Sequence, residues 1–151
     1  MSLDNWGQGL HPFAAFTASV CNLRPSSRGS IHVSGPAAAD APAIQPNYLS
    51  TEEDKRVAVD SLKWARRIVS QKALEPYQPE EYKPGAHVTA HGDLVKAAGE
   101  LGTTIFHPVG TAKMGTEDDK MAVLDARLRV RGIRGLRVVD ASVMPTITSG
   151  N

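Results

Sequence analysis

Residues 51–69 read TEEDKRVAVDSLKWARRIV, and this stretch decides the fold class. Thr51, followed three residues later by Asp54, is typical of a helix N-terminus, where a side-chain oxygen accepts a hydrogen bond from a free backbone amide. Apolar residues then recur three or four positions apart, at Ala58, Leu62, Ala65 and Val69. This spacing places them on one helical face and predicts a helix over residues 52–74.

A second, shorter apolar stripe follows a region rich in proline. Pro76, Pro79 and Pro84 predict a long loop after the first helix, because proline lacks an amide donor. Leu94 to Leu101 then carries the second stripe, and Gly102 stands where a helix commonly ends. We therefore expect two main helices.

Alternating apolar positions predict strands elsewhere. Residues 14–22 alternate and should return through a turn to pair with residues 30–33 in a hairpin, whereas residues 34–46, rich in Ala, Pro and Gly, predict a loop. Residues 123–131 alternate with one solvated face, and residues 136–140 are typical of a buried strand that ends at an acidic turn. Two helices and about five strands in mixed order predict an α+β fold with a mixed or antiparallel sheet.

The composition excludes several classes of protein. The 151 residues carry a net charge of +1, which gives no general attraction to nucleic acid. The single cysteine allows no internal disulfide, and no apolar run approaches the roughly 20 residues that span a bilayer. We expect a cytoplasmic protein without a transmembrane segment, and both ends of the chain are predicted to be cut rather than natural.

His107 is the main candidate for chemistry. It follows the apolar Ile105 and Phe106 and precedes Pro108, which restricts its backbone to an extended conformation. Gly110 and Gly115 should let the loop after it approach another surface closely. From spacing alone, a lone buried histidine is more often a packing residue than a catalytic one.

Four blocks of sequence make a catalytic role for His107 the favoured interpretation. They are FHPVGTAKMG at residues 106–115, VLD at 123–125, GLRVVDASVMP at 135–145 and SGN at 149–151. In order and spacing they resemble the C-terminal region of the glucose-methanol-choline (GMC) oxidoreductases, and among these most the choline dehydrogenase-like branch. The resemblance extends over nearly the whole chain from about residue 14.

The resemblance implies an enzyme that oxidises a primary alcohol, choline-like or other, to an aldehyde by hydride transfer to FAD. It implies that His107 acts on the hydroxyl proton as a base and that Asn151 orients the substrate oxygen. It also implies that Asp140 and Ala141 meet the cofactor through backbone groups.

The resemblance further implies how the chain divides. An N-terminal segment would cover residues 1–13, a substrate-binding domain residues 14–135, and residues 136–151 would return to an FAD-binding domain whose remainder is missing. The dinucleotide fingerprint G-x-G-x-x-G is not present, since Gly7-Gln8-Gly9 lacks its third glycine. We therefore expect that this piece does not bind FAD alone and is inactive alone. The alternative is a non-catalytic module or truncated subunit.

Other side-chain groups favour simpler interpretations. His87 and His91 have the spacing of two zinc ligands on a helix, but no third ligand is evident, so no metal site is predicted. Five arginines between residues 127 and 137 alternate with apolar residues and are interpreted as a solvated strand face. Ser142 and Ser149 lack the strand-turn-helix context of a hydrolase nucleophile. Aromatic residues make up 5% of the chain and form no obvious cluster that could hold a cationic substrate.

Overall fold

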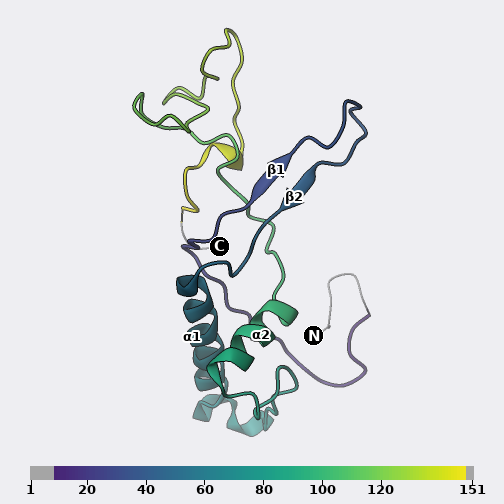
Figure 1. The fold of residues 1–151 in the computed structure, drawn as a ribbon. Helices are drawn as coiled ribbons and strands as arrows, with labels where there is room; N and C mark the ends of the chain where they lie inside the picture. The colour runs from purple at the N-terminus through teal and green to yellow at the C-terminus, as the bar shows by residue number, and fades with distance from the viewer. Residues whose placement is uncertain (1–8, 149–151) are drawn as a thin grey trace. The chain divides into compact units, whose positions relative to one another are not determined.

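The computed structural model describes residues 9–148, which form two compact units. Unit 1 contains the described residues up to Asn22 together with Leu49–Thr103, and unit 2 contains Leu23–Tyr48 and the described residues from Thr104 onward. Unit 1 holds the two main helices and unit 2 a two-stranded antiparallel sheet (Figure 1). The α+β prediction is confirmed.

Helix α1 of unit 1 spans Glu52–Val69 and begins as predicted. The Thr51 hydroxyl accepts from the Asp54 amide at 3.2 Å, and acidic residues fill the first turn while Arg66 and Arg67 fill the last. Both arrangements favour the helix dipole. The helix ends five residues earlier than predicted, because the Gln71 amide bonds to the Ile68 carbonyl in the tighter 3₁₀ pattern. A 3₁₀ helix over Lys72–Tyr77 follows it.

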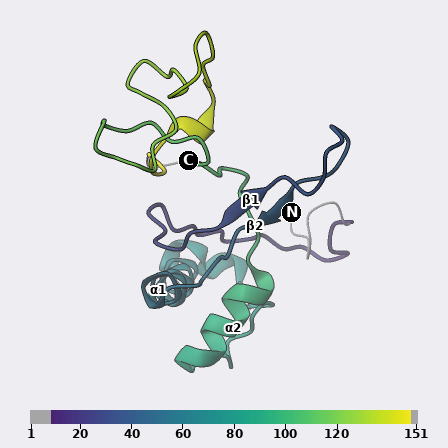
Figure 2. The same ribbon diagram turned by 45° about the horizontal axis from the view of Figure 1, so that its top comes forward.

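Helix α2 spans His91–Leu101, and its end is confirmed. The Gly102 amide closes it by donating to the Ala98 carbonyl at 2.9 Å. Figure 2 shows α1 and α2 side by side within unit 1. Val59 of α1 and Leu94 and Ala97 of α2 are buried, so the apolar faces of the two helices form the core of this unit. No helix within residues 9–148 is both long enough and apolar enough to cross a membrane.

Arg66 fixes the proline-rich loop to α1. Its guanidinium donates to both carboxylate oxygens of Glu81, at 2.8 and 2.9 Å, and to the carbonyls of Gly85 and Val88. This planar fork satisfies four acceptor atoms, from three residues of the loop, at once. One half-buried side chain therefore orders a segment that has no ladder of its own.

The strand predicted at residues 14–22 is wrong, because the segment forms no backbone ladder. It is held instead by side chains: Asn22 donates to the buried carboxylate of Asp54 at 3.1 Å. Nearby, the rings of His11, Phe13 and Tyr82 pack against one another with centroids 4.9 to 5.3 Å apart. These rings pack on one another, so they stabilise the segment and do not test the expectation that no aromatic cluster holds a cationic substrate.

The hairpin of unit 2 pairs β1 (Ser30–His32) with β2 (Ala43–Gln45), in the register Ser30 to Gln45 and His32 to Ala43. The first of these strands was predicted, but its partner lies inside residues 34–46, which were expected to be a loop. A turn between the two strands reverses the chain so that they can pair. In this turn the Asp40 amide donates to the Ala37 carbonyl, and the Asp40 carboxylate accepts from the Ala37 amide, both at 3.0 Å.

The remainder of unit 2, residues 104–148, consists of loops joined by isolated bridges around buried Ala122, Leu124 and Val143. The strand predicted over residues 123–131 is reduced to single bridges, because the Asp125 carboxylate accepts from the Arg127 and Arg129 amides and folds the chain into a turn. The strand predicted over residues 136–140 keeps one bridge, between Arg129 and Arg137, and its Leu136 and Val139 are exposed rather than buried.

Candidate functional site

His107 lies on the loop that opens the second segment of unit 2, and its side chain is exposed. The preceding residue, Phe106, has a left-handed backbone with φ of 62°, and its amide donates to the Thr104 hydroxyl at 3.0 Å. The Phe106 ring is 65% exposed. The described residues of this chain therefore do not enclose the imidazole.

The loop after His107 is hydrogen-bonded to the turn that contains Asp140 and Ala141. The amides of Gly110 and Ala112 both donate to the Ser142 carbonyl at 3.1 Å, and the Met114 amide donates to the Val143 carbonyl at 2.9 Å. These three donors alternate along the chain, as they do along one edge of a strand. Two segments that are 30 residues apart in sequence are thereby joined by backbone hydrogen bonds.

The opposite edge of the same loop is also bonded. The Lys113 carbonyl accepts from the amides of Val123 and Leu124, and the Gly115 amide donates to the Leu124 carbonyl at 3.1 Å. Gly115 approaches this segment so closely that an added Cβ would lie 2.8 Å from the Cβ of Ala122. The predicted close approach at Gly115 is confirmed.

The turn itself depends on Asp140. Its carboxylate accepts from the Ser142 amide at 2.8 Å and from the Ser142 hydroxyl. The hydrogen bond from the Ser142 side chain, followed by the one from its backbone, lowers the pKa of Asp140 below its ordinary value. Ala141 begins the 3₁₀ helix Ala141–Val143, and its amide donates to no acceptor within residues 9–148. Asn151, like Ser149, lies outside the described residues.

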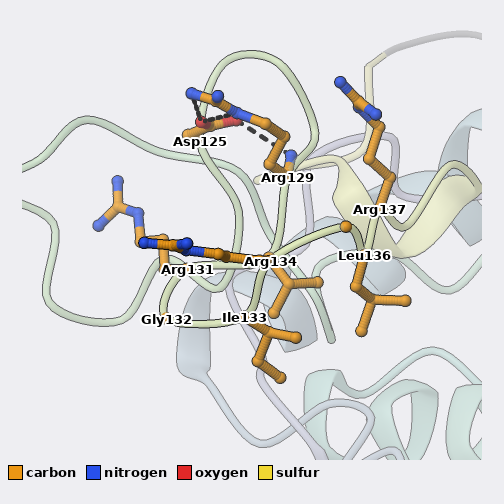
Figure 3. Close-up of a pocket in the computed structure, with 10 residues that line it drawn as sticks. Asp125, Arg129, Arg131, Gly132, Ile133, Arg134, Leu136 and Arg137 are labelled. Carbon is orange, nitrogen blue, oxygen red and sulfur yellow. Dashed lines mark hydrogen bonds and ion pairs between the residues drawn. The ribbon is translucent and has the colours of Figure 1, made fainter.

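A pocket of about 530 Å³ lies where the chain folds back over residues 125–137 (Figure 3). Asp125 and Arg129 form an ion pair at 2.7 Å on one side of it, and Ile133 and Leu136 extend on the side away from this pair. The Arg129 side chain and backbone hydrogen bonds lower the pKa of Asp125 to about 2. The interpretation of the arginines as one solvated strand face is therefore wrong, because their backbone turns instead of extending.

Arg131 differs from the other arginines of this pocket because it holds a neighbouring loop. Its guanidinium donates to the carbonyls of Gly115, Thr116 and Asp119, at 2.8, 2.7 and 3.2 Å. On the same loop Lys113 pairs with Asp119 at 2.7 Å, and the pKa of Asp119 is lowered mainly by the hydrogen bond from Lys113. Arg131 and Lys113 thus fix the loop that follows Gly115.

The two histidines with zinc-like spacing do not share a helix. His91 is the first residue of α2, whereas His87 belongs to the loop before it. Over residues 9–148, no three metal-ligating side chains come together.

Sequence reasoning named His107, Asp140 and Ala141 but missed the residue that links their segments. Ser142 was considered only as a nucleophile and set aside, yet its carbonyl is the acceptor shared by two amides of the His107 loop. A carbonyl is present in every residue, so no side-chain pattern could have identified it. The one available signal was Gly110, which adopts a φ of 90° that favours glycine.

Comparison with known proteins adds an independent line of evidence. Residues 25–151 match the GMC oxidoreductase family. The oxygen-dependent choline dehydrogenase of Vibrio vulnificus is 41% identical over 145 residues, which are 96% of this chain and 26% of that protein. The corresponding dehydrogenase of Pseudomonas putida is 44% identical over 136 residues, 90% of this chain and 24% of that protein. The chain thus spans about a quarter of the length of these curated relatives.

Solved structures agree with the sequence relatives. Pyridoxine 4-oxidase from Mesorbium loti has a TM-score of 0.79 at 36% identity, over 85% of this chain and 25% of that one. An FAD-dependent oxidoreductase from Chaetomium thermophilum has a TM-score of 0.78 at 28% identity, over 85% of this chain and 22% of that one. With a family match over residues 25–151 and relatives above 40% identity, this chain belongs to the GMC oxidoreductase family, as a choline dehydrogenase-like form of its C-terminal domain.

Proposed function

We propose that this chain is the C-terminal part of an FAD-dependent enzyme that oxidises a primary alcohol, choline-like or other, to an aldehyde. His107 is the base that takes the hydroxyl proton, and Asn151 orients the substrate oxygen. The observation that carries the proposal is the backbone bonding between the His107 loop and the Asp140 turn. A base must be held at a fixed place relative to the cofactor, and this connection supplies such a constraint.

An imidazole suits the role of base. Its unperturbed pKa of roughly 6.5 leaves a large neutral fraction near neutral pH, so it can accept a proton there. The exposed side chain of His107 is free to meet a substrate from outside this chain. Removal of the hydroxyl proton makes the carbon-bound hydrogen a better hydride donor, and the flavin of FAD, when bound, supplies the hydride acceptor.

The described residues fit one edge of an FAD site, not a whole one. The Ala141 amide has no acceptor within residues 9–148 and can donate to a cofactor oxygen, as can the backbone of Asp140 beside it. A phosphate-binding loop of the G-x-G-x-x-G type is missing from the sequence. We propose that residues 136–151 return to an FAD-binding domain supplied by further polypeptide, that residues 14–135 form the substrate-binding domain, and that residues 1–13 precede it.

The exposed apolar residues of unit 2 support this division. Ile133, Leu136 and Val139 are 55%, 47% and 73% exposed, and all three fall within seven residues of sequence. Ile133 and Leu136 line the pocket of Figure 3, and Val139 follows them in sequence. Exposed apolar residues of this kind are expected where a domain packs against missing polypeptide.

The test compares this chain with the full-length protein that contains it. We expect flavin absorbance and alcohol oxidation only with the longer polypeptide. In that protein His107→Ala should lower kcat by on the order of 10² to 10⁴ while flavin stays bound, because a positioned base is lost. Asn151→Ala should lower it less, because orientation is lost but the base remains.

His32→Ala provides the matched control, since His32 is also an exposed histidine of unit 2, on strand β1. It should leave kcat unchanged. Near-normal turnover by His107→Ala would remove this residue from the mechanism. Flavin binding and turnover by the 151-residue chain alone would show that the cofactor site has been misjudged. A full-length protein that binds no flavin would instead support a non-catalytic module.

A further inference from the structure

The side chain of Asp140 has a use that backbone contact with a cofactor does not explain. One of its oxygens, Oδ1, accepts from both the amide and the hydroxyl of Ser142, two residues further on. Behind this contact the Val143 amide donates to the Asp140 carbonyl, and the Met144 amide donates to the Ala141 carbonyl, both at 3.2 Å. This arrangement is a side-chain cap on a short turn, which selects one backbone conformation among several.

The capped conformation matters because of where it places the Ser142 carbonyl. That oxygen uses both lone pairs, one for the Gly110 amide and one for the Ala112 amide. Gly110 reaches it with a φ of 90°, and a Cβ added there would lie 3.4 Å from the Met144 carbonyl oxygen. A small rotation of the turn would therefore lengthen two hydrogen bonds together.

His107 lies only three residues before this anchored point. Pro108 stands between them and restricts the backbone on its own account. On the far side the loop is fixed through Lys113, whose carbonyl accepts from Val123 and Leu124. The loop is therefore held on both edges, and a movement of the turn should displace His107 as well.

We propose that Asp140 is a positioning residue, whose carboxylate caps the turn at Ser142 and thereby sets the place of the loop that carries His107. The catalytic part of this inference rests on the proposed function, whereas the structural part does not. Asp140 acts on the reaction through Ser142 and Gly110, so what it needs is an acceptor oxygen at Oδ1 and not a negative charge.

The experiment uses three variants of the full-length flavoprotein: Asp140→Ala, Asp140→Asn and the control Asp118→Ala. Asparagine retains the Oδ1 acceptor without the charge. Asp118 is another exposed carboxylate of unit 2 and is bonded within a turn, to Thr116. Among the described residues, the ion pair between this turn and residues 110–114 is made by its neighbour Asp119, which pairs with Lys113, and not by Asp118. Hydrogen exchange of the peptide covering residues 108–115 is measured alongside flavin content and kcat.

For Asp140→Ala we expect exchange of that peptide to become about tenfold faster, as for loss of a turn cap. We expect kcat to fall at least ~10-fold through misplacement of His107, with bound flavin retained. Asp140→Asn should restore both quantities to within about twofold of wild type, since the cap geometry is rebuilt. Asp118→Ala should change neither.

The outcomes separate this inference from the proposed function. If the wild-type protein does not oxidise alcohols, the proposed function is wrong. The hydrogen-exchange measurement then still tests whether Asp140 holds the loop that carries His107. Unchanged exchange in Asp140→Ala, or an Asp140→Asn protein as impaired as Asp140→Ala, would overturn the positioning role. If Asp140→Ala does not fold, the Ser142→Ala variant tests the positioning role instead. It removes only the hydroxyl donor and should speed exchange by a factor of about two to three, and no change would count against the proposal.

Discussion

The two units of this chain are stabilised by different means. In unit 1 two regular helices pack their apolar faces together, with Val59 and Leu94 almost completely buried. In unit 2 residues 104–148 have no ladder longer than a bridge, and side chains such as Arg131 and Asp140 fix the backbone instead. The candidate site lies in the irregular unit. Irregular backbone allows carbonyls and amides to point at one another, or at a ligand, in directions that a helix does not permit.

The first test of this contrast compares the buried leucine of each unit. Leu94 and Leu124 are both 0% exposed. Truncation of either to alanine should destabilise its unit by about 2–5 kcal/mol, because a cavity remains where the side chain packed. Native-state hydrogen exchange should show the loss of protection confined to the unit that carries the substitution. A loss spread equally over both units would show that they are not independent.

The same glycine substitution should have opposite signs in the two units. Gly115→Ala should destabilise unit 2 by about 1–3 kcal/mol, because its Cβ would meet Ala122 and Asp119 at 2.8 Å. Gly99→Ala should stabilise α2 by roughly 0.5–1 kcal/mol, since alanine favours the helix. Nothing there is closer than Leu49, at 3.9 Å. Denaturant midpoints of the two variants check both signs, and two shifts in the same direction would contradict the contrast.

In each unit an arginine holds a neighbouring loop, and replacement of either by lysine should have a similar effect. Arg66 donates to Glu81 and two carbonyls, and Arg131 donates to three carbonyls. Lysine cannot reproduce either planar fork, so each substitution should cost about 1–2 kcal/mol. Hydrogen exchange should become faster in residues 78–88 for Arg66→Lys and in residues 115–121 for Arg131→Lys. A silent Arg131→Lys variant would show that unit 2 depends on its small core alone.

The smallest expected effect is the loss of stability of unit 2 at low pH. Hydrogen bonds lower the pKa of four carboxyls of unit 2, Asp118, Asp119, Asp125 and Asp140, and of Glu52 in unit 1. A depressed pKa in the folded state means that the ionised group contributes stability above its ordinary value. That contribution is lost as pH falls through the folded value. For Asp125 the window runs from the ordinary 3.8 down to about 2, so unit 2 should loosen within it before unit 1 does.

A carboxyl-carbon NMR titration checks this expectation. The midpoint of Asp125 should lie near 2 in the wild-type protein, and Arg129→Ala should raise it toward 3.8, because the Arg129 side chain is the largest cause of the shift. An unchanged midpoint in the variant would assign the shift to the backbone bonds instead.

The contrast also explains what could be predicted from the sequence. Helix α1 was predicted correctly from the spacing of its apolar residues and from its Thr51 cap. The residues on one face of a helix recur every three or four positions, so the sequence itself carries the signal. The strand predicted over residues 123–131 failed although its alternation is regular, because Asp125 bonds its own neighbours and bends the chain. Such a local hydrogen bond competes with the hydrogen bonds between strands. The alternation of apolar and polar residues in the sequence is the same whether or not that bond forms.

The candidate site shows the same division. His107, Asp140 and Ala141 were named as candidates because they stand in recognisable motifs. Their connection was not predicted, because it passes through the carbonyl of Ser142, and every residue has a carbonyl. The pairing of β1 with β2 was missed for a similar reason, since β2 lies in a stretch whose composition favours a loop.

The alternating bonds along residues 110–115 constrain how the length of this protein can vary during evolution. Amides of residues 110, 112 and 114 face the turn, while the groups of residues 113 and 115 face the opposite edge. Insertion or deletion of one residue here would exchange the two edges and break every bond in the segment. The exposed turn at Thr116–Asp118 is held by a side chain, with Arg131 donating to the Thr116 carbonyl, and not by alternating backbone bonds along two edges. Length differences among homologues should therefore gather after Gly115 and spare the five residues before it.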